Sequence, residues 1–155
     1  MYNIRILNPQ LLSLLARVRH TNALIIADCG FPFYSGPETV DISLVNDVPT
    51  VLQVLAAIRP EFRIEQAYMA REFIDYNMLD TQARFTEALA DVPFSYEPHV
   101  EFKRRVPAAI GLIRTGDTTQ YANVILVSGP GAAPIKRAVA HQSTTTQRAE
   151  VASVS

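Results

Sequence analysis

The stretch ALIIADCG (residues 23–30) contains five consecutive apolar residues followed at once by a carboxylate, a cysteine and a glycine. A short, unbroken apolar run of this kind is typical of a strand buried on both faces of a sheet. Such strands occur where helices cover the sheet on both sides. The stretch therefore predicts an α/β fold in which Asp28 stands at the end of a central strand.

The residues before this strand predict an amphipathic helix that starts at Pro9 and ends near Arg19. Asn8 can cap the helix, and proline suits its first turn because its missing N–H would have no partner there. Apolar residues recur at the spacing of one helix face. They are Leu11, Leu14, Leu15 and Val18.

The rest of the chain continues this alternation of helices and short apolar runs. Helices are predicted at 47–58, 80–90 and 98–105, and extended or strand-like runs at 40–44, 62–69, 94–96, 108–113 and 124–127. Residues 30–39 (GFPFYSGPET) have the composition of a loop, although an unusually aromatic one. We therefore expect a single layered α/β domain over residues 1–130, with a mainly parallel or mixed central sheet flanked by helices. The polar, aperiodic residues 131–155 predict a C-terminal extension that is partly disordered.

Composition narrows the classes of function. The chain has 155 residues, 48% of them hydrophobic and 19% charged, with a formal net charge of −1. This balance does not favour nucleic acid or an anionic membrane surface as a partner. No apolar run approaches the roughly 20 residues of a membrane span, and no secretory signal is recognisable at the N-terminus. The single cysteine, Cys29, suits a reducing compartment, so we expect a cytoplasmic globular protein.

His20 and Asp28 flank the first strand and are candidates for chemistry. A histidine just past a helix can transfer protons near neutral pH, or it can simply cap the last helical carbonyls. A carboxylate at a strand end can hold hydroxyl groups or orient a histidine, or it can start an Asx-type turn. One strand separates the two residues. They can meet only if the chain doubles back or if a neighbouring subunit contributes one of them.

Two further segments offer polar side chains. His99 begins a charged helix, where it is either a solvated surface residue or a site residue. Tyr121 and Asn123 lead into the last strand, and an aromatic hydroxyl beside an amide suits sugar hydroxyls, although a purely structural turn is the alternative. His141 lies in the polar tail, and we expect it to be inert.

Several kinds of site have no support in the sequence. The histidines and the single cysteine match no metal-ligand spacing, so no metal site is expected. No glycine-rich phosphate loop is followed by Lys-Ser/Thr, which argues against nucleotide binding. A G-x-S-x-G nucleophile motif is also missing, and no base stands at a diagnostic spacing from Cys29. Covalent catalysis is therefore not supported.

Taken in register, these segments resemble the D-ribose pyranase (RbsD/FucU) family over about residues 8–127. The segments that carry the resemblance are RHTN (19–22), DCGFP (28–32), VDISL (40–44), VP (48–49) with QVL (53–55), HVEFK (99–103), IRTGD (113–117) and YANVIL (121–126). Any one of them is weak, but together they are specific. Two departures stand out: the loop at 31–34 is more aromatic than in ribose-type members, and the chain extends past the usual end of the family.

The resemblance implies a cofactor-independent enzyme that interconverts ring forms of a free monosaccharide. It implies His20 as the general acid and a sugar-binding role for Asp28, His99, Tyr121 and Asn123. It also implies a homodecamer of two stacked five-membered rings with sites between subunits. The histidine of the HVEFK segment favours the pyranase branch, with β-D-ribopyranose and β-D-ribofuranose as substrate and product.

Three alternatives remain open from the sequence. The protein could be a mutarotase that exchanges the anomers of L-fucose or another sugar. It could be a non-catalytic monosaccharide-binding accessory of sugar uptake, with His20 idle. It could also be an assembly protein whose apolar residues 31–34 only join subunits.

Overall fold

The computed structural model describes residues 5–61 and 63–130. The predicted extension at 131–155, including His141, lies outside them. The elements follow in the order α1 (Pro9–Arg17), β1 (Ala23–Ala27), β2 (Glu38–Asp41), α2 (Val51–Ile58), β3 (Ile64–Ala70), α3 (Glu72–Tyr76), α4 (Leu79–Ala88), β4 (Phe94–Glu97), α5 (His99–Arg105), the 3₁₀ helix η1 (Val106–Ala108), β5 (Gly111–Arg114) and β6 (Val124–Ser128).

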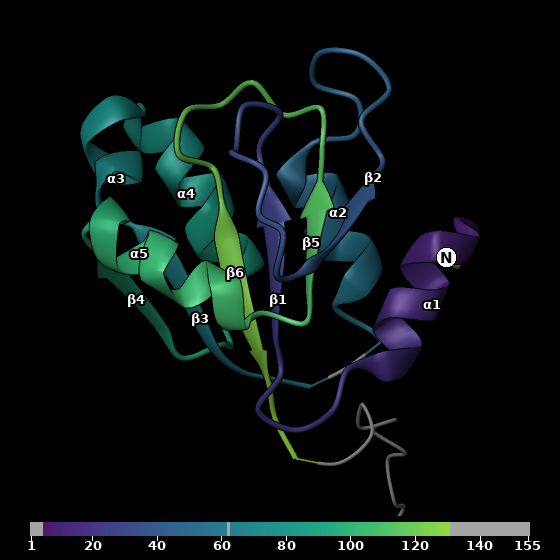
Figure 1. The fold of residues 1–155 in the computed structure, drawn as a ribbon. Coiled ribbons are helices and arrows are strands. Elements are labelled where there is room, and N and C mark those ends of the chain that lie inside the picture. The colour runs from purple at the N-terminus through teal and green to yellow at the C-terminus, as the bar shows by residue number, and fades with distance from the viewer. Residues whose placement is uncertain (1–4, 62, 131–155) are drawn as a thin grey trace, which may run out of the picture.

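The strands in the described residues form one mixed six-stranded sheet with the order β2-β5-β1-β6-β3-β4. β1, β2 and β5 pair in parallel, as do β3 and β4, whereas β6 lies antiparallel between β1 and β3. Five carboxyl ends and the amino end of β6 therefore share one edge of the sheet, which we call the upper edge (top of Figure 1). This is the edge at which open α/β sheets assemble binding sites.

Helices cover both faces of this sheet, as the sequence predicts (Figure 1). On β1 the side chains alternate between the two sides: Leu24 and Ile26 pack in a large core with α1, α2, α3 and α4, whereas Ile25 and Ala27 pack in a smaller core with α5. Ala27 and its three predecessors are buried, because β1 is central and both its faces are covered. The α/β fold class is confirmed.

Some boundaries differ from the sequence prediction. The helix expected from residue 47 begins at Val51, because Thr50 caps it and forms a capping box with Gln53. The strand expected at 40–44 is β2, which ends at Asp41, and the run at 108–113 divides into η1 and β5. The short helix α3 was not predicted, because its five residues show no apolar residues at helical spacing.

Candidate active site

A pocket of about 390 Å³ opens at the upper edge of the sheet. Its volume is in the range of small-molecule sites. The lining residues come from the loop after β1, the end of α3, the start of α5 and the loop before β6. They are Asp28, Gly30, Phe31, Pro32, Tyr76, His99, Gln120, Tyr121 and Asn123. The fold thus brings together four of the five predicted site residues, which lie up to 95 positions apart in the sequence.

Asp28 and Asn123 form the polar part of this pocket. The backbone N–H of Asp28 donates to Oδ1 of Asn123 at 2.7 Å, and Oδ1 of Asp28 accepts the N–H of Gly30 at 3.0 Å. Asp28 therefore makes the Asx-type turn that its sequence suggested, and it also faces the pocket. Burial raises the pKa of the Asp28 carboxyl, while hydrogen bonds from Asn123 and Gly30 oppose the rise. A carboxylate and an amide placed side by side can receive neighbouring hydroxyl groups.

His99 is held at the first residue of α5 by contacts on three sides. Its backbone N–H donates to Oε2 of Glu72 at 2.9 Å. The ring stacks on Phe102 with centroids 6.0 Å apart, and it meets the Tyr121 ring edge-on at 5.1 Å. Burial and the nearby Lys103 lower the pKa of His99, an effect that Glu72 partly offsets. The shift favours the neutral imidazole, which can both donate and accept a hydrogen bond.

The Nδ1 atom of His99 is buried and makes no hydrogen bond within the described residues. An unpaired buried polar atom costs free energy. His99 lines the pocket, so a hydroxyl group of a bound molecule is one partner that could satisfy this nitrogen. His99 therefore lines the pocket with a buried ring nitrogen and is not a solvated surface histidine.

Tyr121 reaches the pocket from a tight loop before β6. Its φ of 56° lies in the left-handed region, which is uncommon for a residue with a side chain. Two residues further on, the buried Asn123 directly precedes β6. The loop thus presents the Tyr121 ring and the Asn123 amide in the same pocket.

The buried carboxylate of Asp117 holds this loop in place through hydrogen bonds. Its Oδ2 accepts the N–H of Val51 at the start of α2 at 2.9 Å, and its Oδ1 accepts the N–H of Thr119 at 2.8 Å. Its backbone oxygen accepts the N–H of Cys29 at 2.9 Å. Asp117 does not line the pocket. It ties together α2 and the two loops that carry Asp28 and Tyr121.

His20 is not part of this pocket. It follows α1 and precedes β1, at the end of the sheet opposite to Asp28, where Thr21 N–H donates to the backbone oxygen of Ser128. Its Nε2 lies 3.5 Å from Oε2 of Glu65, and its side chain is about half exposed. Within one copy of the chain, the predicted acid His20 therefore lies apart from the predicted sugar-binding residues.

The aromatic loop after Asp28 has two roles in the structure. Phe31 is buried and packs against Tyr34 and Phe102, with ring centroids 5.9 Å and 6.2 Å away. The backbone oxygens of Cys29 and Phe31 accept hydrogen bonds from the Arg114 guanidinium, which holds the loop against β5. The loop thus packs against the core while Phe31 also lines the pocket.

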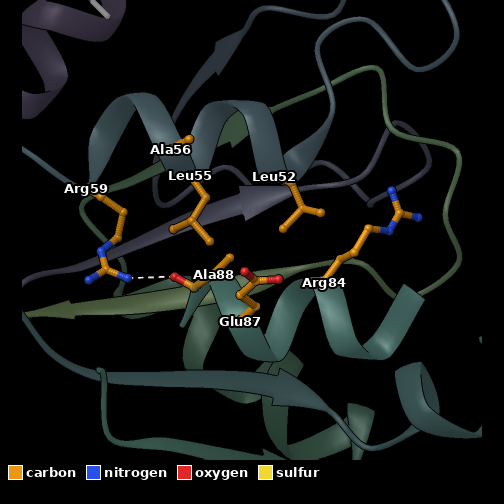
Figure 2. A pocket seen from close by; sticks show the side chains of 7 residues that line it. All are labelled: Leu52, Leu55, Ala56, Arg59, Arg84, Glu87 and Ala88. Atoms are coloured by element: carbon orange, nitrogen blue, oxygen red, sulfur yellow. Dashed lines mark hydrogen bonds between the residues drawn. The ribbon is translucent and has the colours of Figure 1, made fainter. Parts of the chain in front are cut away.

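A second hollow, of about 400 Å³, lies between α2 and α4 on one face of the sheet (Figure 2). Leu52, Leu55 and Ala56 of α2 and Ala88 of α4 give it a mainly apolar lining, and the charged side chains around it are Arg59, Arg84 and Glu87. Arg59 at one end donates to the Ala88 backbone oxygen at 2.7 Å. None of the predicted site residues lines this hollow, so the pocket at the upper edge is the better candidate.

Residues 5–61 and 63–130 contain neither a metal site nor a membrane-spanning helix. No group of three or more His, Cys, Asp or Glu side chains there is arranged to hold a metal ion. Within the same residues, no helix is long and apolar enough to cross a membrane.

Comparison with known proteins relates this geometry to a family. The profile of the RbsD / FucU transport protein family matches residues 1–130. The chain is 41% identical over 124 residues to a D-ribose pyranase of Geobacillus kaustophilus, covering 80% of this chain and 90% of that one. It is 37% identical over 132 residues to a D-ribose pyranase of Rhodopirellula baltica, covering 83% and 98%.

Solved structures of related proteins share this fold. RbsD of Bacillus subtilis, determined in complex with D-ribose, superposes with a TM-score of 0.76 at 32% identity and covers 83% of this chain and 98% of that one. A fucose mutarotase of Streptococcus pneumoniae shares the fold, with a TM-score of 0.66 at 18% identity over 80% and 94% of the two chains. With its fold and most of its length matched in this way, the chain belongs to the RbsD/FucU family.

Proposed function

We propose that this protein is an isomerase that interconverts the β-pyranose and β-furanose forms of free D-ribose without a cofactor. The observation that carries the proposal is the convergence of Asp28, His99, Tyr121 and Asn123 on one pocket, in a chain 41% identical to a D-ribose pyranase. These are the residues to which the sequence resemblance assigns sugar binding. The pocket offers hydrogen-bond donors and acceptors that suit sugar hydroxyl groups, and it also contains aromatic side chains.

The reaction needs acid–base chemistry and positioning. The pyranose ring opens when its ring oxygen takes up a proton while the anomeric hydroxyl loses one, and a different hydroxyl then closes onto C1. A well-placed acid contributes about 10²–10⁴-fold to such a step. Holding the reacting hydroxyl near C1 supplies a further acceleration. Asp28 and Asn123 would hold sugar hydroxyls in the proposed complex, and neutral His99 would hold another.

We assign the general acid to His20, supplied by a second copy of the chain. Because His20 lies at the opposite end of β1 from Asp28, a complete site requires a neighbouring subunit. The half-exposed position of His20 leaves it accessible to such a neighbour, and the Glu65 carboxylate 3.5 Å away can orient the imidazole. This assignment goes with a cytoplasmic homodecamer, as the family resemblance implies.

Saturation-transfer NMR on D-ribose tests the reaction and the acid together. Wild-type protein is expected to accelerate exchange between ribopyranose and ribofuranose signals, and His20→Ala to slow this exchange by about 10²-fold or more. His141→Ala is the matched control, because it removes a histidine to which no role is assigned. Light scattering on each variant checks that assembly is unchanged.

Four other results would overturn the proposal. Acceleration of L-fucose anomer exchange alone would identify a mutarotase, and retained activity in His99→Ala would point the same way. Ribose binding without acceleration would identify a non-catalytic binding protein. An oligomer whose melting temperature no sugar changes would leave only an assembly role.

A further inference from the structure

Tyr76 lines the pocket although no sequence pattern singled it out. It is the last residue of α3, and its ring centroid lies 5.2 Å from that of Tyr121 with the planes tilted by 43°. Tyr121 in turn meets His99 edge-on at 5.1 Å. The three rings form a row that begins at the partly buried His99 and ends at the exposed Tyr76.

Hydrogen bonds fix the end of α3 against the loop that carries Tyr121. The Nδ2 amide of Asn77 donates to the backbone oxygen of Phe73 at 2.8 Å and to that of Gln120 at 2.9 Å. Nε2 of Gln82 donates to the backbone oxygen of Asn77 at 2.8 Å. Tyr76 is therefore attached to a backbone that is held from both sides, so the position of its Cα relative to the pocket is set before any ligand binds.

The Tyr76 side chain is 62% exposed in the free chain. Neither its ring nor its hydroxyl is needed to fill the core, and no hydrogen bond from the hydroxyl is seen in the described residues. A monosaccharide presents hydroxyl groups around its ring and apolar C–H surface on its faces. Asp28, Asn123 and His99 suit the hydroxyls, which leaves the C–H surface for an aromatic partner. Aromatic rings bind through large apolar area of fixed shape.

We propose that Tyr76 is a substrate-binding residue whose ring packs against the C–H face of the bound sugar. The proposal rests on the proposed function, because it takes a free monosaccharide as the ligand. The contribution comes from the aromatic face, so it does not require the phenolic hydroxyl. The contact also excludes water from one side of the sugar without taking part in proton transfer.

The test compares Tyr76→Ala, Tyr76→Phe and the matched control Met78→Ala. Met78 is 80% exposed, lies two residues further along and does not line the pocket. Removal of the ring is expected to raise KM and Kd for D-ribose about tenfold, with kcat changed less than about threefold. Tyr76→Phe and Met78→Ala are expected to stay within about twofold of wild type in all three constants. NMR exchange rates give KM and kcat, and calorimetry gives Kd.

Other outcomes overturn the proposal. An equal loss in Tyr76→Phe and Tyr76→Ala would assign the effect to the hydroxyl, and an unchanged Kd in Tyr76→Ala would remove the contact. Dissociation of the Tyr76→Ala oligomer, seen by light scattering, would make Tyr76 an interface residue instead. If wild-type protein binds ribose but does not accelerate exchange, the proposed function fails while the Kd series still decides the role of Tyr76. If it does not bind ribose, both fail.

Discussion

At the residue scale, burial shifts the carboxyl and the imidazole of the pocket toward their uncharged forms. It raises the pKa of Asp28 and lowers that of His99. Such opposite shifts are the expected effect of desolvation on an acid and on a base. A pocket that disfavours extra charge is suited to a neutral ligand, and a free sugar is neutral. The same two residues give the most direct tests of the site.

Asp28→Asn is expected to weaken D-ribose binding by about 10–100-fold, because hydrogen bonds to a charged acceptor contribute more than those to a neutral one. The Asn side chain retains an oxygen that can accept the Gly30 N–H, so the turn is preserved. Isothermal titration calorimetry measures the affinity. Wild-type affinity in this variant would show that the carboxylate does not contact the sugar.

His99 also predicts a pH dependence of stability. Its pKa in the folded protein lies below the ordinary value of 6.5, so the unfolded chain binds more protons in the interval beneath 6.5. The free energy of unfolding therefore decreases as the pH falls from 6.5 toward the folded-state pKa, and this contribution is fully present above 6.5. His99→Phe keeps an aromatic ring but cannot titrate. Denaturant titrations should show a shallower loss of stability for His99→Phe over this interval, and parallel curves would contradict the assignment.

At the scale of elements, the pocket depends on two carboxylate side chains that join elements at the upper edge of the sheet. α3 and α5 follow the carboxyl ends of β3 and β4, and Glu72 of α3 accepts the backbone N–H of His99 at the start of α5. Asp117 joins the start of α2 to the loops that carry Asp28 and Tyr121. Removing the Asp117 carboxylate should therefore lower both the free energy of unfolding and the affinity for the sugar.

Asp117→Ala is expected to lower the free energy of unfolding by about 2–4 kcal/mol, because it leaves the N–H groups of Val51 and Thr119 without their acceptor in a buried place. Asp80→Ala is the control: this carboxylate is 89% exposed and lies in the first turn of α4, so its loss should cost under about 1 kcal/mol. Urea denaturation measures both. Equal losses of stability in the two variants would show that the buried hydrogen bonds to Asp117 contribute little.

Element prediction succeeded where the signal was local. The apolar stripe of α1 and the apolar run of β1 could be predicted, because apolar residues recur over consecutive turns of the helix and over consecutive residues of the strand. α3 was missed because five residues are too few to display helical periodicity. The start of α2 was placed too early because hydrogen bonds with a distant residue, Gly116, hold residues 47–49 outside the helix: Asp47 N–H donates to the Gly116 oxygen, and Gly116 N–H donates to the Pro49 oxygen.

At the scale of the whole molecule, the separation of His20 from Asp28 predicts that two impaired variants can complement each other. His20→Ala supplies an intact Asp28, and Asp28→Asn supplies an intact His20. Random co-assembly of equal amounts restores both residues in about a quarter of sites shared between two subunits. NMR exchange rates of the co-expressed mixture at a ribose concentration well below saturation, compared with each variant alone, measure the recovery. A mixture that is no faster than its two variants after verified mixing would place the complete site within one chain.

The sequence alone was enough to predict the α/β class, the family and the polar residues at strand ends, because hydrophobic period, turn residues and motif order are local properties of the chain. The tertiary structure was needed to show which of those residues meet. Asp28, His99, Tyr121 and Asn123 meet because β6 inserts antiparallel between β1 and β3, a pairing between distant segments that no local pattern encodes. The same pairing joins Tyr76 to the pocket and leaves His20 at the opposite end of β1.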